Sequence, residues 1–96
     1  MRLTPAEQAS IKHIVASVFG ADAVLWLFGS RVDDSKRGGD VDLYVVPVLR
    51  DDLYMKRVRC LGELEQALLY PVDLVVNESG RELAIYRVAL EQGVRL

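Results

Sequence analysis

Two aspartates, Asp40 and Asp42, stand at the start of the apolar run from Val41 to Val46, and this pattern constrains the fold more than any other in the sequence. A short apolar run of this kind predicts a β-strand, and residues two positions apart in a strand project to the same face. The two carboxylates are therefore expected side by side, where they repel each other unless a cation is bound. Carboxylate oxygens suit Mg²⁺, which commonly binds one or two carboxylates together with substrate phosphates. Tyr44 is expected on the same face, where it packs against a neighbour or lines a nucleotide pocket.

The segment Gly29-Ser30-Arg31 lies a short polar loop upstream of the two aspartates. Glycine lets a backbone approach a phosphate closely, and serine can cap a short helix whose N–H groups face an anion. Arg31 offers a fork of donors to phosphate oxygens. We therefore interpret Gly29, Ser30 and Arg31 as nucleotide-binding residues.

Simpler roles for the charged residues near this segment stay open. Arg31 is alternatively a surface arginine that pairs with Asp33 or Asp34. Lys36 and Arg37 lie on the intervening loop, where they are further candidates to close over a triphosphate.

A third carboxylate, Asp73, lies within the apolar run of residues 71–76. A charge in a buried strand is costly and needs a partner, although a strand edge that faces water is an alternative position. If this strand neighbours the strand of Asp40 and Asp42, all three carboxylates converge and can hold two metal ions about 4 Å apart. Asp73 would then orient or deprotonate an acceptor hydroxyl, and the chemistry would be phosphoryl or nucleotidyl transfer.

Helix-start signals and apolar runs predict the elements of the first half of the chain. Thr4, Pro5 and Glu7 predict a capping box and the start of a helix that closes at Gly20. The apolar run of residues 23–28 predicts a strand buried on both faces, and the run that follows Asp40 predicts the next.

In the second half, Asp51 and Asp52 are expected to start a helix. Its predicted apolar stripe consists of Tyr54, Val58, Leu61, Leu64 and Leu68.

After Pro71, residues 72–76 are expected to form a strand, and Ser79 to cap a last helix that reaches about Gln92. The side chains expected to face inward from this helix are Leu83, Tyr86 and Leu90. The predicted order α-β-β-α-β-α describes one small α/β (α+β) domain over residues 1–96, with helices packed on a mixed sheet.

Composition excludes several classes of protein. A net charge of −2 and a pI near 5.3 argue against general nucleic-acid binding, which needs a basic face. The lone cysteine, Cys60, excludes an internal disulfide and is expected to pack in the core. Because there is neither a long apolar stretch nor a signal-peptide pattern, we expect a cytoplasmic protein without a membrane span.

Together, Gly29-Ser30-Arg31, Asp40-Val41-Asp42-Leu43 and the later Asp73 resemble the signature of the DNA polymerase β-like nucleotidyltransferases. The chain is most similar to the smallest members of that superfamily, the minimal nucleotidyltransferases (MNT). Gly39 is one departure, because many members have serine before the first aspartate. The resemblance implies transfer of AMP from ATP with release of pyrophosphate, with Asp40, Asp42 and Asp73 as ligands of Mg²⁺.

Minimal nucleotidyltransferases commonly pair with a HEPN ribonuclease toxin and neutralise it as antitoxins, by adenylylation of a tyrosine and by tight binding. The resemblance therefore implies a toxin–antitoxin system and a HEPN partner for this chain. Related enzymes that act on small acceptors generally add a second domain to bind them. We expect no such domain after Leu96, and this expectation also favours a protein acceptor. Two alternatives stay open: an antitoxin that acts by binding alone, and an aminoglycoside-type nucleotidyltransferase. The sequence does not indicate the preferred base, the number of nucleotides transferred or the oligomeric state.

Overall fold

A four-stranded sheet forms the centre of the part of the chain that the computed structural model describes, which is residues 3–32 and 39–96. The order across the sheet is β3 (Val72–Val76), β2 (Val41–Val46), β1 (Val24–Phe28) and β4 (Val94–Arg95). β1 runs antiparallel to β2 and β4, whereas β2 and β3 run parallel. The predicted mixed sheet is confirmed. β4, which has two residues, was not predicted because so short a segment carries no periodicity.

The first helix, α1 (Pro5–Phe19), has the predicted capping box. The hydroxyl of Thr4 accepts a hydrogen bond from the Glu7 N–H at 3.1 Å, and the Glu7 carboxylate accepts one from the Thr4 N–H at 2.9 Å. At the other end, the N–H of Gly20 donates to the carbonyl of Ala16, and φ of +108° at Gly20 suits glycine. Local sequence signals were sufficient here because every one of these bonds joins residues close in the chain.

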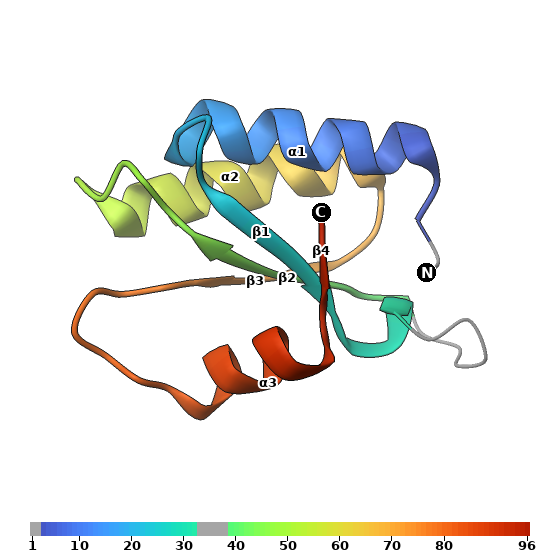
Figure 1. The fold of residues 1–96 in the computed structure, drawn as a ribbon. Coiled ribbons are helices and arrows are strands. Elements are labelled where there is room, and N and C mark those ends of the chain that lie inside the picture. Colours follow the sequence, from blue (N-terminus) through green and yellow to red (C-terminus); the bar gives the residue numbers. More distant parts are fainter. Residues whose placement is uncertain (1–2, 33–38) are drawn as a thin grey trace.

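Helices cover both faces of the sheet. Figure 1 shows α1 and α2 (Leu53–Leu68) together on one face and α3 (Ala84–Gln92) on the other. Alternate residues of each strand point to the two sides. The main core, beneath α1 and α2, consists of Leu3, Ile11, Val15, Val18, Phe19, Leu25, Leu27, Val41, Leu43, Val45, Cys60, Leu64, Leu68 and Leu74. The smaller core, beneath α3, consists of Phe28, Tyr44, Tyr86 and Ala89.

The predicted apolar stripe of α2 is partly wrong. Leu64 and Leu68 are buried as expected, but Tyr54 and Val58 are exposed. The buried positions of the helix are Cys60, Leu64 and Leu68, which repeat every four residues and face the main core. The helix carries two overlapping apolar stripes, and packing against the sheet selects the one that contains Cys60. The expected core position of this cysteine is confirmed.

The ends of the later helices also differ from the prediction. α3 begins after Leu83, so Ser79 lies in a turn and caps no helix. Tyr86 is buried as predicted, together with Ala89, but Leu83 and Leu90 are exposed. At the start of α2, Asp52 occupies the N-cap position with φ of 56°, but its side chain makes no capping hydrogen bond.

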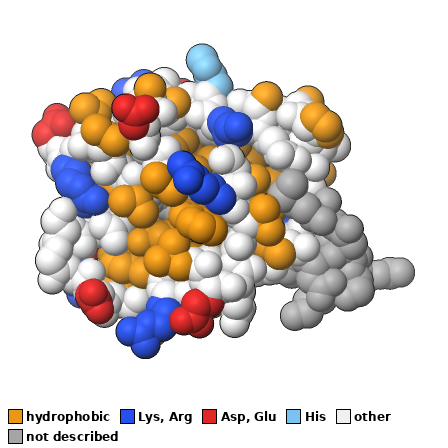
Figure 2. Space-filling model, in the orientation of Figure 1, with side chains coloured by type: hydrophobic (Ala, Val, Ile, Leu, Met, Phe, Trp, Pro, Cys, Tyr) orange, Lys and Arg blue, Asp and Glu red, His pale blue; other side chains and the backbone are white. Residues whose placement is uncertain are grey.

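Hydrophobic side chains also reach the surface between the two helical layers. Figure 2, in the orientation of Figure 1, shows them gathered on this face between α1 and α3, with charged side chains around them. No helix within the described ranges combines the length and the apolar character needed to cross a membrane.

Candidate active site

Asp42 and Asp73 lie directly opposite each other on neighbouring strands. The parallel pairing of β2 with β3 aligns Asp42 with Asp73, and neighbouring strands are about 4.8 Å apart. Val41 and Leu43 belong to the main core, so the intervening Asp42 projects to the face that α3 covers. Asp40 immediately precedes β2 and shares this parity. The condition stated in the sequence analysis, that these two strands are neighbours, is met.

The charges of Asp73 and Asp40 both act on Asp42. The pKa of Asp42 is raised above its ordinary value, first by partial burial, then by the charges of Asp73 and Asp40. Asp73 itself is exposed because β3 is an edge strand, so the expectation of a buried charge there is wrong. Among the described residues, no three His, Cys, Asp or Glu side chains lie close enough together to hold a metal ion. The three-carboxylate metal site stays a prediction.

Gly29 lies against the Asp42 carboxylate. It begins a 3₁₀ turn, η1 (Gly29–Val32), directly after β1, and the register of β1 and β2 aligns its neighbour Phe28 with Asp42. A Cβ atom added to Gly29 would lie 3.0 Å from Cγ of Asp42 and still closer to its Oδ2. Gly29 also has φ of +77°, which side chains other than glycine rarely adopt. Glycine is therefore required here for two independent reasons.

Two carboxylates thus lie opposite each other on adjacent strands, with the glycine turn against one of them. The family model for the nucleotidyltransferase domain matches residues 9–96. The chain belongs to this nucleotidyltransferase family. The predicted superfamily and fold class are thereby confirmed.

One solved structure has a similar fold. The crystal structure of a mutant toxin–antitoxin MntA-HpeT superposes on this nucleotidyltransferase domain with a TM-score of 0.71, at 22% sequence identity. The match covers 93% of this chain and 70% of that chain. It agrees in fold with the predicted resemblance to minimal nucleotidyltransferases. No curated protein matches the sequence.

Arg31 of the nucleotidyltransferase domain is an internal residue. Its side chain is 7% exposed, so the alternative of a surface arginine is wrong. One terminal nitrogen donates to the carbonyl of Gly39 at 3.1 Å, and the guanidinium lies 4.4 Å from the centre of the Tyr70 ring. Arg31 thus ties η1 to the residue that immediately precedes Asp40. Its expected contact with phosphate stays a prediction.

Several predicted residues cannot be placed in the site. The side chain of Ser30, the loop candidates Lys36 and Arg37, and the alternative partners Asp33 and Asp34 all lie outside the described parts of the structure. Their roles stay predictions.

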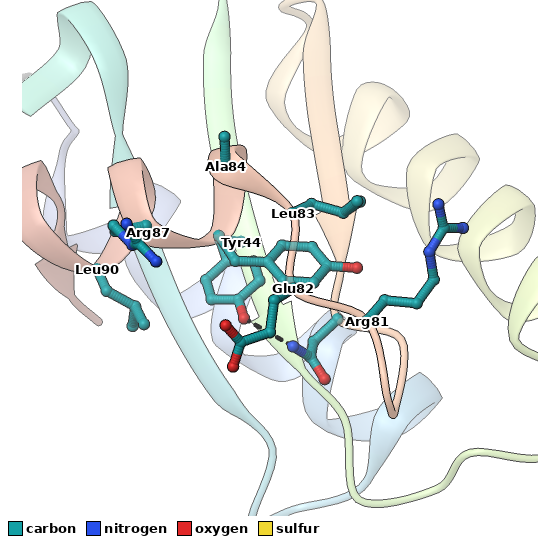
Figure 3. A pocket seen from close by; sticks show the side chains of 9 residues that line it. Tyr44, Arg81, Glu82, Leu83, Ala84, Arg87 and Leu90 are labelled. Carbon is teal, nitrogen blue, oxygen red and sulfur yellow. Dashed lines mark hydrogen bonds between the residues drawn. The ribbon is translucent and has the colours of Figure 1, made fainter.

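The face of the sheet that carries the aspartates also forms a pocket of about 520 Å³ that the sequence analysis did not predict (Figure 3). Tyr44 contributes to it from β2. Its other residues come from the position directly after β3, from the segment before α3 and from α3 itself: Asn77, Arg81, Glu82, Leu83, Ala84, Tyr86, Arg87 and Leu90. The position of Tyr44, two residues after Asp42, was the one signal in the sequence that pointed to this pocket.

Aromatic stacking and hydrogen bonds hold the floor of this pocket. The rings of Tyr44 and Tyr86 stack with their centres 5.2 Å apart and an interplanar angle of 25°. The Tyr44 hydroxyl accepts a hydrogen bond from the side-chain amide of Asn77 at 3.0 Å, drawn as a dashed line in Figure 3. Arg50 in turn donates to the carbonyl and side-chain oxygens of Asn77. Tyr44 therefore packs against its neighbour and lines a pocket at the same time.

Proposed function

We propose that this chain is a Mg²⁺-dependent nucleotidyltransferase that moves AMP from ATP to a hydroxyl of a partner protein, and that it acts in the cytoplasm as the antitoxin of a HEPN toxin. The observation that carries this proposal is the alignment of Asp42 with Asp73 beneath Gly29 in a chain that belongs to the nucleotidyltransferase family. A pure binding module has no use for two carboxylates side by side, because their repulsion opposes folding.

The donor set of the site fits magnesium. Asp40, Asp42 and Asp73 offer only carboxylate oxygens, the ligands this ion prefers. Burial and mutual repulsion raise the pKa of Asp42, and a bound cation would relieve the repulsion. When bound by these three residues, magnesium would supply charge neutralisation to the triphosphate and to the departing pyrophosphate.

The remaining steps belong to residues of the chain. The glycine turn at Gly29 and Ser30 lets the backbone approach the triphosphate. Asp73 accepts the proton of the acceptor hydroxyl, whose oxygen forms a bond to the α-phosphorus of ATP. The bond from the α-phosphorus to the oxygen that bridges to the β-phosphate breaks, so pyrophosphate leaves and AMP stays on the acceptor. Arg31 positions the start of β2 through its hydrogen bond to Gly39.

The similar fold of MntA-HpeT supports the antitoxin part of the proposal. That structure is of a toxin–antitoxin pair, and its mutant carries glutamate in place of two aspartates that are spaced as Asp40 and Asp42 are. We extend this to the present chain as a proposal: its partner is a HEPN ribonuclease, and the acceptor is a tyrosine of that partner.

The test is intact-mass spectrometry after incubation with Mg²⁺-ATP and the protein encoded beside this chain. We expect the partner to gain the mass of one or more AMP units, and Asp40→Asn/Asp42→Asn to abolish the gain. Asp22→Asn is the matched control, because this exposed aspartate lies in the turn before β1. An unmodified partner in a stable, inactive complex would overturn the enzymatic proposal and indicate neutralisation by binding alone.

A further inference from the structure

A second cavity, of about 380 Å³, runs along the outer edge of β3. It lies between the start of α2 and the segment that leads into α3. Residues of different chemistry line it, chief among them Tyr54, Arg57, Asp73, Arg81, Leu83 and Tyr86. Asp73 therefore has Asp42 beside it on the neighbouring strand, and a molecule from solvent can reach it through this cleft along β3.

An exposed apolar face of α2 continues from the mouth of the cleft. Tyr54 is 75% exposed, Met55 is 55% exposed and Val58 is 44% exposed. These positions fall on one side of the helix, because residues three and four apart are neighbours on a helix surface. Tyr54 belongs to both the helix face and the cleft wall. Contiguous exposed apolar surface of this kind is typical of protein interaction sites.

Two main-chain carbonyls on the outer edge of β3 already have donors within the domain. In a parallel pair the main-chain groups of alternate residues point outward, and the Asn77 N–H to Val45 carbonyl bond marks odd-numbered residues of β3 as facing β2. The carbonyls of Leu74 and Val76 therefore point outward. Arg57 donates to the first at 2.9 Å, and the Tyr86 hydroxyl lies 3.4 Å from the second. These two carbonyls are therefore not open to a partner strand, which favours binding through side chains.

Four charged side chains line the cleft: Arg57 and Arg81, together with Asp73 and Glu78. Arg57 donates to the Leu74 carbonyl, which leaves Arg81 as the cation that a partner can engage. Arg81 pairs with Glu78 at 2.8 Å, and both side chains are at least half exposed, so the pair contributes little to stability. Arg81 can therefore exchange Glu78 for a carboxylate of a partner at small cost.

We propose that this cleft, with the adjoining apolar face of α2, is the docking site of a protein acceptor. The hydroxyl-bearing side chain enters along β3 toward Asp73, an apolar surface of the acceptor covers Tyr54, Met55 and Val58, and an acceptor carboxylate pairs with Arg81. The assignment of the cleft to the acceptor rests on the proposed function, in which Asp73 takes the proton of the acceptor hydroxyl. The apolar face extends along the helix beyond the cleft, which favours a folded protein over a small molecule.

The decisive variant is Tyr54→Glu/Val58→Glu, which places charge on the apolar face at positions that are exposed and tolerate substitution. The matched control is Ile85→Glu/Val88→Glu, because these two side chains are each 37% exposed on α3 and line neither cavity. Both variants are measured for melting temperature, for the thermal shift that Mg²⁺-ATP produces, and for binding and AMP transfer to the protein encoded beside this chain.

We expect the α2 variant to lose at least tenfold in binding and in AMP transfer, while its melting temperature and its response to Mg²⁺-ATP stay at wild-type values. The α3 variant should stay within twofold of wild type. Loss of binding only in the α3 variant would overturn the proposal. So would a dimer of the isolated chain that the α2 variant dissociates, because a second copy would then cover this face.

The binding measurement separates failure of this inference from failure of the proposed function. If the wild-type chain binds the neighbouring protein without AMP transfer, the enzymatic proposal fails, and weaker binding by the α2 variant still supports the docking surface. A wild-type chain that neither binds nor modifies that protein overturns both.

Discussion

Gly29 and Asp42 are in such close contact that no side chain fits between them. Gly29 follows β1 and Asp42 lies in β2, and the antiparallel register brings the glycine turn over the carboxylate. The same carboxylate belongs to the residue that the parallel register of β2 and β3 places opposite Asp73. Any residue larger than glycine would have to move the carboxylate or the turn.

The first prediction is that Gly29→Ala destabilises the domain and abolishes AMP transfer. We expect the free energy of unfolding to fall by about 2–3 kcal/mol, because alanine at φ of +77° is strained and its Cβ would overlap the Asp42 carboxylate. Gly80→Ala is the control: Gly80 has φ of +79°, but a Cβ there meets nothing within 4 Å. Urea unfolding of both variants separates backbone strain, which both share, from overlap with Asp42, which only Gly29→Ala has. Equal losses in the free energy of unfolding would contradict the role of the Asp42 contact.

The second prediction concerns the dependence of stability on pH. Because the folded state raises the pKa of Asp42 above 3.8, the folded chain binds a proton more tightly than the unfolded chain. Stability therefore decreases as pH rises from the unfolded pKa through the raised folded pKa. Asp42→Asn removes this penalty, so its melting temperature should exceed that of wild type at pH 7 by about 1–3 °C, a modest gain because solvent screens the group.

Melting curves in EDTA across the acid range are the measurement. The gain should vanish below about pH 3, where the carboxylate is protonated in both states. Asp22→Asn, at an exposed turn position, should show no such gain. An Asp42→Asn variant no more stable than wild type at pH 7 would show that the carboxylate carries no electrostatic penalty.

The third prediction is that MgCl₂ stabilises the wild-type domain. A ligand that binds only the folded state raises the melting temperature as its concentration exceeds its dissociation constant. We expect a rise in differential scanning fluorimetry for wild type and none for Asp40→Asn/Asp42→Asn, because the double variant lacks two of the proposed ligands. Equal shifts in both proteins would place magnesium elsewhere.

The fourth prediction concerns the hydroxyl of Tyr86. It accepts a hydrogen bond from the Glu78 N–H at 3.0 Å and anchors the segment between β3 and α3. Tyr86→Phe leaves that N–H without its acceptor, so we expect a loss of about 1–2 kcal/mol in the free energy of unfolding. Tyr54→Phe, whose ring is largely exposed, should change stability by less than about 0.5 kcal/mol. Similar losses for the two variants in urea titrations would argue against the anchoring role.

The fifth prediction is that Cys60 is unreactive in the native protein. The side chain is completely buried in the main core, and burial raises the pKa of its thiol to about 12. At pH 8 we expect no reaction with Ellman's reagent in buffer and full reaction in denaturant. Rapid labelling of the folded protein would mean that the core beneath α2 opens readily.

Local signals predicted some elements accurately and others poorly. The start of α1 was predictable because Thr4 and Glu7 satisfy each other across a single turn. The inward face of α2 was not predictable in the same way. The helix has one apolar stripe that begins at Tyr54 and another that begins at Cys60, and only contact with the sheet shows which of them is buried. The start of α3 was also predicted wrongly. The contact that fixes this helix on the sheet is the stacking of Tyr86 on Tyr44, which joins residues distant in the chain.

The sequence by itself determined that Asp40 and Asp42 share a face, because side-chain alternation along a strand is a property of the backbone. It also indicated the nucleotidyltransferase family, through the motifs that include Gly29. Only the tertiary structure decided that Asp73 lies opposite Asp42, that Arg31 turns inward to Gly39, and that a pocket forms between Tyr44 and α3. These relationships join residues distant in the chain, and they depend on which apolar faces bury one another, which no local pattern encodes.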